Sequence, residues 1–378
     1  MQFRSTQKVW SKLRFLVLSF LFLFSISASA TCSTSDSHKS HDVVFIHGIA
    51  SNKGAFGHWA EYLKKYHPNE CINSHFFEYD TGNNKLNLED FIQSFDSYMH
   101  KNFEHSNSKI TIVAHSQGGL ITMFWLKSMD EAQDPIRHRV KNIMTMATPY
   151  YGAIIANLGY SLGTFVLPIL GKKELKNMKI GSKKVVETLE FFKSSHFKDI
   201  ISDKNFVTIS ATLAPSIFDI EGDFAVAPFS SNPNIKNEQE ASTHYNIDGV
   251  HLRFRLFGTP ATTLVSKYCL ISPARCENSS LAIFEKEFLG NQKVKINYAK
   301  DINTFAVYLR TKEKGPFWVH SNNIQRGLRL SFIHIRDDLY FYKGYLIDGD
   351  TSAELIVSHG NRTSVIEVNS GQTSYLTH

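Results

Sequence analysis

The stretch Lys109-Ile-Thr-Ile-Val-Ala-His-Ser-Gln-Gly-Gly-Leu-Ile-Thr-Met-Phe-Trp-Leu126 decides the fold of this chain. An apolar run, Lys109–Val113, precedes Ala-His-Ser-Gln-Gly at Ala114–Gly118, and a second apolar run follows. This pattern predicts a strand, one sharp turn and a helix, with small residues that let the backbone bend tightly. Ser116 at the turn is therefore the predicted nucleophile, because such a turn lifts its hydroxyl out of the sheet.

A segment upstream predicts the groups that would stabilise negative charge beside Ser116. Asp42–Ile46 is a short apolar run that ends in His47-Gly48-Ile49. A glycine at the end of a strand lets the next N–H, that of Ile49, point at a developing oxyanion, and the Gln117 N–H is the second predicted donor. Taken alone this segment would be an ordinary buried strand, and its pairing with the serine turn favours the oxyanion hole.

Three motifs together resemble a known family: His47-Gly48-Ile49, Ala114–Gly119 and Ala147-Thr-Pro-Tyr-Tyr-Gly-Ala153. They follow the order and spacing of α/β-hydrolase-fold lipases, and the chain looks most like small secreted bacterial lipases and esterases over about residues 42–270. The resemblance implies an α/β fold with a mostly parallel sheet, helices on both faces and a lid insertion at about 152–200. It also implies hydrolysis of acyl esters through a Ser-acid-His triad without a cofactor, and it says little about which substrate is cleaved.

On this fold the acid and then the histidine follow the nucleophile along the chain. Asn205–Ser210 is a predicted strand, and Asp223 in the loop after it is the predicted acid, with Asp219 in reserve; both could instead cap turns. His251 is the predicted general base, since His244 lies in a polar run that predicts exposure.

The proposed chemistry assigns one role to each of these groups. The base takes the proton of the Ser116 hydroxyl, the acid orients the imidazole, and the two N–H groups bind the oxyanion. Neither a cofactor nor a metal is required. A thioesterase or an acyltransferase would use the same triad, so both remain alternatives.

The segment between the fourth core strand and Asn205 has the size of a lid. No charged residue occurs from Thr145 to Gly171, and Ala153–Leu170 is rich in Ile, Leu, Phe and Val. We expect a mobile lid that covers the acyl pocket and contacts a lipid interface; a buried helix pair that caps the domain is the alternative.

Beyond Cys276 the pattern changes to short runs typical of strands, and it predicts a separate antiparallel β-sandwich over 281–378. It carries no catalytic motif, so a non-catalytic surface-binding protein that uses this part is the alternative of another class. The predicted strands are Thr304–Arg310, Phe317–His320, Leu328–Arg336, Leu339–Ile347, Glu354–Val357 and Ser364–Val368.

The first 30 residues predict a cleaved secretory signal, because four basic residues precede the apolar run Phe15–Ile26 and Ala28-Ser29-Ala30 fits a cleavage site. We therefore expect a secreted or periplasmic protein whose hydrolase domain begins at residue 31. Removing the signal lowers the net charge from +6 to +2, so the composition gives no reason to expect a nucleic-acid partner. The sequence does not indicate an oligomeric state.

The four cysteines all follow this signal, and an even number in an oxidising compartment predicts two disulfides. The favoured pairings are Cys32 with Cys71 and Cys269 with Cys276. A zinc site formed by these cysteines is the alternative, but no C-x-x-C spacing supports it.

Overall fold

Six parallel strands form the central sheet of the described part of the chain, in the order β2-β1-β3-β4-β5-β6. Their bounds are β1 His41–Ile46, β2 Ile72–Phe77, β3 Lys109–His115, β4 Val140–Met146, β5 Asn205–Ala211 and β6 Ser242–Ile247. The computed structural model describes residues 41–67, 70–153, 156, 171–211, 226–233, 242–247, 273–293, 296, 302–315, 317–321, 333–336, 338–347 and 349–377.

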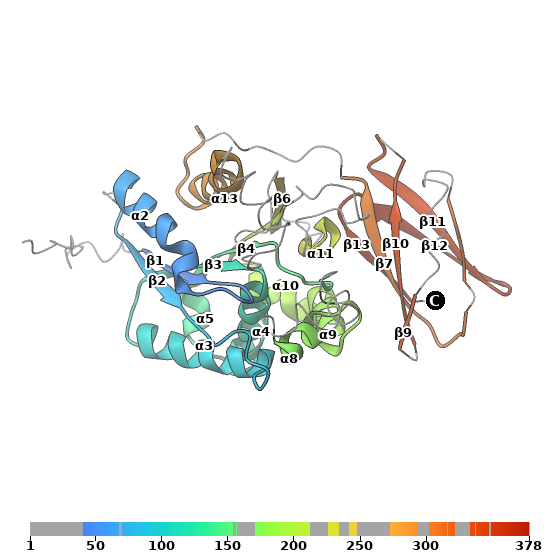
Figure 1. Ribbon diagram of the computed structural model, residues 1–378, viewed down its shortest axis with the longest axis horizontal. Helices are drawn as coiled ribbons and strands as arrows, with labels where there is room; N and C mark the ends of the chain where they lie inside the picture. The colour runs from blue at the N-terminus through green and yellow to red at the C-terminus, as the bar shows by residue number, and fades with distance from the viewer. Residues whose placement is uncertain are drawn as a thin grey trace, which may run out of the picture. The chain divides into compact units, whose positions relative to one another are not determined.

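Helices cover both faces of this sheet, as the sequence predicts. The helices are η2 Lys53–Phe56, α2 Gly57–Tyr66, α3 Leu88–Phe103, α4 Gln117–Glu131, α5 Ile136–Arg139, α8 Lys172–Met178, α9 Lys183–Lys193, α10 Ser195–Ile201, α11 Pro228–Ser231 and α13 Pro273–Phe288. Helices α3, α4 and α5 lie on one side, and α2 and α13 on the other (Figure 1).

Side chains alternate between the two faces of the sheet, and this explains why the sheet has an apolar core on each face. In β1, Val44 and Ile46 belong to the core cluster that includes α3 and α4, whereas Val43 and Phe45 belong to the cluster with α2 and α13. Successive side chains of a strand point to opposite faces, so a strand buried on both sides is apolar throughout. The short apolar run before His47 is such a strand.

The segment expected to be a lid is largely helical and packed where the structure describes it. Helices α8, α9 and α10 bury apolar side chains in the main core, among them Leu175, Val185 and Phe197. The alternative of helices that cap the domain therefore describes residues 172–201 better. The apolar run that motivated the lid lies almost wholly outside the described residues, so a lid over 154–170 stays a prediction.

Two further sheets follow near the C-terminus, one of four strands in the order β13-β7-β10-β9 and one of three in the order β12-β11-β8. They share an apolar core that includes Phe305 and Val307 from β7 and Leu355 and Val357 from β11, so they form a sandwich. The strand bounds are β7 Thr304–Arg310, β8 Trp318–His320, β9 Ile333–Arg336, β10 Leu339–Tyr345, β11 Ser352–His359, β12 Arg362–Asn369 and β13 Thr373–Thr377.

Strand β13 is absent from the sequence prediction, and it departs from the antiparallel pattern. It pairs with β7 in parallel, with Thr373 opposite Ala306. All other pairings described in these two sheets are antiparallel. Its five residues, Thr-Ser-Tyr-Leu-Thr, are too few and too polar to give a periodic signal by themselves.

The boundary predicted at residue 280, between a hydrolase domain and a β-rich domain, falls within one compact unit of the structure. Residues 41–378 form one compact unit, and the boundary falls inside α13, whose Ile283 and Phe284 pack on the central sheet. Strand β7 is buried on both faces: Phe305 and Val307 point into the sandwich, whereas Ala306 and Tyr308 join the hydrolase core. The β-rich part is therefore an integral layer of this fold.

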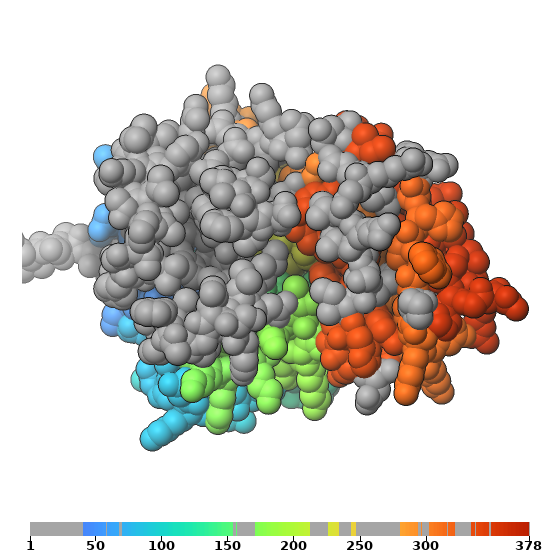
Figure 2. All heavy atoms as spheres, turned by 45° about the vertical axis from the view of Figure 1, so that its right-hand side comes forward, coloured from blue at the N-terminus to red at the C-terminus, as the bar shows by residue number. Residues whose placement is uncertain are grey.

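Strand β7 packs against the helices of the hydrolase part, and we call this contact the seam. Hydrogen bonds cross it. The Tyr308 hydroxyl donates to the Tyr151 carbonyl at 2.8 Å and accepts from the Gly181 N–H at 3.3 Å. Arg310 pairs with Glu190 of α9 at 2.8 Å. Figure 2 shows the green surface of α9 next to the orange and red surface of the C-terminal strands.

The predicted signal segment, Cys32 and Cys269 lie outside the described residues, so export and both cysteine pairings stay predictions. Among the helices that the structure describes, none has the length and apolar character to cross a membrane.

Candidate active site

Ser116 lies at the turn between β3 and α4, as the sequence predicts. Its backbone has φ 54° and ψ −123°, a combination that is rare for a residue with a side chain. The Ser116 N–H donates to the Met146 carbonyl at 2.8 Å, and the Gly119 N–H donates to the Ser116 carbonyl at 3.0 Å. This sharp, strained turn has the geometry of a nucleophile elbow.

The glycines after Ser116 allow close packing, which explains why small residues are needed there. A Cβ atom on Gly118 would lie 2.7 Å from the His47 carbonyl oxygen. One on Gly119 would lie 2.0 Å from Oγ1 of Thr148, which follows β4. The elbow is therefore pressed against the ends of the two neighbouring strands.

The loop after β1 reaches the nucleophile. A Cβ atom on Gly48 would lie 2.8 Å from the Cβ atom of Ser116, so the structure brings the two motifs into contact. Neither the Ile49 N–H nor the Gln117 N–H donates a hydrogen bond within the part of the chain that the structure describes. Two backbone donors without a partner beside a serine hydroxyl are what an oxyanion hole requires.

Tyr79 connects these two segments, and sequence analysis missed it. Its ring stacks on His47 with centroids 4.4 Å apart. Its hydroxyl oxygen lies 2.9 Å from the His47 carbonyl oxygen and 3.1 Å from Oε1 of Gln117, and the hydroxyl donates to these two acceptors. Burial holds the pKa of Tyr79 well above its usual value, so it remains a donor. Its place just after β2 could have indicated it, because ligand sites gather at the carboxyl ends of parallel strands.

Asp223, its reserve Asp219 and His251 lie outside the described residues, so the structure does not test these assignments. They nevertheless have defined places in the chain order. The two carboxylates lie between β5 and β6, and His251 follows the end of β6 by four residues. Each therefore follows the carboxyl end of a strand parallel to β3.

His244 occupies a different setting from the one that its polar neighbours predict. It lies within β6, opposite Thr208 of β5, and its Nδ1 is 2.7 Å from the Thr208 hydroxyl. Burial lowers the pKa of His244 to about 4. The expectation of an exposed run is wrong here, because pairing with β5 incorporates these residues into the sheet.

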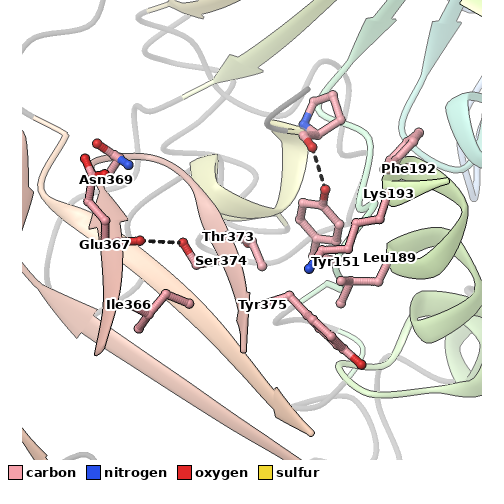
Figure 3. A pocket seen from close by; sticks show the side chains of 11 residues that line it. Tyr151, Leu189, Phe192, Lys193, Ile366, Glu367, Asn369, Thr373, Ser374 and Tyr375 are labelled. Atoms are coloured by element: carbon pink, nitrogen blue, oxygen red, sulfur yellow. Dashed lines mark hydrogen bonds between the residues drawn. The ribbon is translucent and has the colours of Figure 1, made fainter. Parts of the chain in front are cut away.

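A hollow of about 260 Å³ lies at the seam between α9 and the C-terminal strands (Figure 3). The Lys193 ammonium lies 3.9 Å from the centre of the Tyr375 ring, and burial lowers the pKa of this lysine to about 8. Ser116 does not line this hollow. Its lining residues are Tyr151, Leu189, Phe192, Lys193, Pro233, Ile366, Glu367, Asn369, Thr373, Ser374 and Tyr375.

No three His, Cys, Asp or Glu side chains converge as a metal site within the described ranges.

Comparison with protein families identifies the segment that carries the elbow. Residues 36–183 match the family model described as "Putative serine esterase (DUF676)". The match covers less than half of the chain, so this segment is similar to that serine esterase family. It spans β1, the elbow and β4, and it supports ester-bond hydrolysis by the chain. No curated protein matches the sequence.

Solved structures share the fold of the chain beyond the matched segment. Phospholipase PlaB from Legionella pneumophila, in complex with thio-NAD, is 13% identical with a TM-score of 0.58, covering 89% of this chain and 93% of that chain. A second structure of PlaB gives a TM-score of 0.56. A match over 89% of the chain extends well beyond residues 36–183, so the shared fold covers a region that the family match does not reach.

The mature form of Bacillus licheniformis lipase BlEst2 is 15% identical with a TM-score of 0.43, covering 61% of this chain and 92% of that chain.

Proposed function

We propose that the chain is an exported serine hydrolase of the lipase or carboxylesterase kind, which cleaves acyl esters through Ser116, Asp223 and His251. The observation that carries the proposal is the contact between the strained turn at Ser116 and the Gly48 loop. The contact supports a site in which the Ser116 hydroxyl faces the N–H groups of Ile49 and Gln117, neither of which donates a hydrogen bond to a described residue. Such donors stabilise the charge that forms on the substrate oxygen in the transition state.

The order of the strands supports the choice of acid and base. The nucleophile follows β3, the proposed acid follows β5 and the proposed base follows β6, all in one parallel sheet. Residues that follow the carboxyl ends of parallel strands meet at the same edge. His244 is a poor alternative, because it lies within β6 and its pKa of about 4 is far from that of an efficient base near neutral pH.

In the proposed reaction, His251 accepts the Ser116 proton as the hydroxyl attacks the ester carbonyl. The oxyanion accepts hydrogen bonds from Ile49 and Gln117, and the alcohol leaves with the proton from His251. Water then hydrolyses the acyl-enzyme by the same route, and Asp223 orients the imidazole throughout.

An acyl lipid is the substrate class that the sequence favours. The uncharged run from Thr145 to Gly171 immediately follows the strand that flanks the elbow. PlaB, which shares the fold, is named a phospholipase. An apolar lid over Ala153–Leu170 would contact lipid and raise activity when substrate passes from monomer to micelle.

Hydrolysis of p-nitrophenyl esters of graded chain length, measured beside a thioester, tests this function. We expect ester turnover that Ser116→Ala abolishes and His251→Ala lowers by orders of magnitude, since the residues of a triad act as a unit. Thioester-only turnover would favour the thioesterase alternative. Folded protein without turnover on either substrate would favour a surface-binding protein.

A further inference from the structure

Helix α8 carries a carboxylate that is fully buried close to the proposed oxyanion hole. The Glu174 side chain is inaccessible to solvent, and in the described part of the chain no lysine, arginine or histidine pairs with it. Oε2 accepts from the Thr81 hydroxyl at 2.9 Å, and Oε1 accepts from the Gly82 N–H at 2.6 Å. Burying a carboxylate without a positively charged partner costs free energy of folding, so Glu174 is a candidate for a functional role.

One route leads from Glu174 to the loop that holds the first proposed donor. The Thr81 hydroxyl gives its hydrogen to the carboxylate and accepts from the Ala50 N–H at 3.0 Å. Ala50 directly follows Ile49, and its φ of 53° is uncommon for a residue with a Cβ atom. The carboxylate thus orients the hydroxyl that holds this strained turn.

Glu174 also lies near the side chain of Gln117, the residue of the other proposed donor. The Gln117 side chain is fully buried and favours the ionised form of Glu174. At its other end, Oε1 of Gln117 accepts from Tyr79, which also holds the His47 carbonyl. Within the described residues Nε2 of Gln117 has no hydrogen-bond partner, so Tyr79 fixes this side chain at its Oε1 end only.

We propose that Glu174 is a positioning residue for the oxyanion hole, which it holds through Thr81 and Ala50. The inference rests on the proposed function of Ser116. Burial raises the pKa of Glu174 to about 7, with the charge of Asp80 acting in the same direction, whereas the bonds from Thr81 and Gly82 oppose it. These donors therefore limit the rise in the pKa of Glu174, and the side chain acts on the hole through Thr81.

A purely structural role for Glu174 makes a different prediction. The same carboxylate also packs against Gly171 at the start of α8, where a Cβ atom would lie 2.6 Å from Oε1. If Glu174 only secured α8, its replacement would lower stability and leave the turnover of each folded molecule unchanged. A positioning role lowers the rate constant for the chemical step in molecules that remain folded.

Glu174→Gln in the full chain tests the inference, with Glu190→Gln as the control because Glu190 is half-exposed and bonded to Arg310 at the surface. We expect kcat on p-nitrophenyl butyrate to fall about tenfold to a hundredfold, below the loss for deleting a donor outright. KM should change less than about twofold. Affinity for an alkyl boronic acid, which forms a tetrahedral adduct on the serine, should fall by the same factor as kcat.

Unchanged kcat and boronate affinity in folded Glu174→Gln would overturn the inference. Thr81→Val removes the hydroxyl that joins Glu174 to Ala50, and it tests the inference if the first variant does not fold. We expect a kcat several-fold lower, and wild-type kcat would contradict the proposal. Failure of the wild type to hydrolyse any ester would instead overturn the proposed function, so the two failures are distinguishable.

Discussion

The elbow at Ser116 and the seam at Tyr308 are both buried, but they are built in different ways. The elbow joins a strand and a helix that are contiguous in sequence, and its glycines are next to the residue that they serve. At the seam, Tyr308 bonds to Tyr151, which is 157 positions away. A local motif can therefore be recognised from sequence, whereas a tertiary contact between two regular segments leaves no local signal.

The seam gives the largest expected effect on folding. A chain that ends at Gly290 lacks the strands whose inner face, including Tyr308 and Phe341, packs into the hydrolase core. Because each Å² of exposed apolar surface costs about 25 cal/mol and domains are stable by only about 5–15 kcal/mol, we expect an insoluble chain or one without a cooperative melting transition. Circular dichroism measures the melting transition, and ester turnover per milligram of soluble protein measures the remaining activity. A soluble truncated chain with full turnover would show that the sandwich is a separate domain.

At the elbow, Gly118→Ala gives the next largest effect. The new methyl would meet backbone carbonyls at 2.7 Å, so the turn must shift. We expect stability to fall by about 1–3 kcal/mol or more and kcat to fall at least a hundredfold, because small displacements of a nucleophile are costly. Gly57→Ala is the matched control, since no atom lies within 4 Å of its new methyl. Equal kcat in both variants would argue against a tightly packed elbow.

These two sites also mark how much the sequence could predict. The elbow, the strand before His47 and the strand at Thr304–Arg310 are where the sequence predicts them, because each is encoded by a contiguous pattern. Glu174 gives no signal, since it is one acidic residue in a lysine-rich stretch and acquires its role only when α8 packs against the loop at Thr81. For the same reason the sequence does not predict that β7 is buried on both faces.

Tyr308→Phe tests the seam independently of the elbow, because it removes only the hydroxyl group. Removing the hydroxyl leaves the Tyr151 carbonyl without this donor, which should cost about 1–3 kcal/mol in urea unfolding. We expect kcat to stay within about twofold, because the elbow does not depend on this bond. Tyr66→Phe, at an exposed tyrosine, should change stability by less than about 0.5 kcal/mol. A large loss of kcat in Tyr308→Phe would mean that the two regions are coupled.

His244→Gln should have the smallest effect on activity, with kcat within about twofold of wild type from pH 6 to 9. The native pKa of His244 is lowered to about 4 by burial, so the ring is neutral in this range. The unfolded chain binds a proton near pH 6.5, so this residue contributes stability above pH 6.5 that is lost as the pH falls towards 4. The variant should therefore lose less stability than wild type between pH 7 and 5. An inactive His244→Gln that folds would make His244 the base in place of His251.

Labelling with a serine-directed fluorophosphonate tests the central claim most directly, because this reagent reacts only with a serine activated by a base and an oxyanion hole. Peptide mass spectrometry of the labelled wild type should find the phosphonate on Ser116, with the Ser116→Ala protein unlabelled under the same conditions. Absence of label on folded wild-type protein, or label on a different serine, would contradict the account.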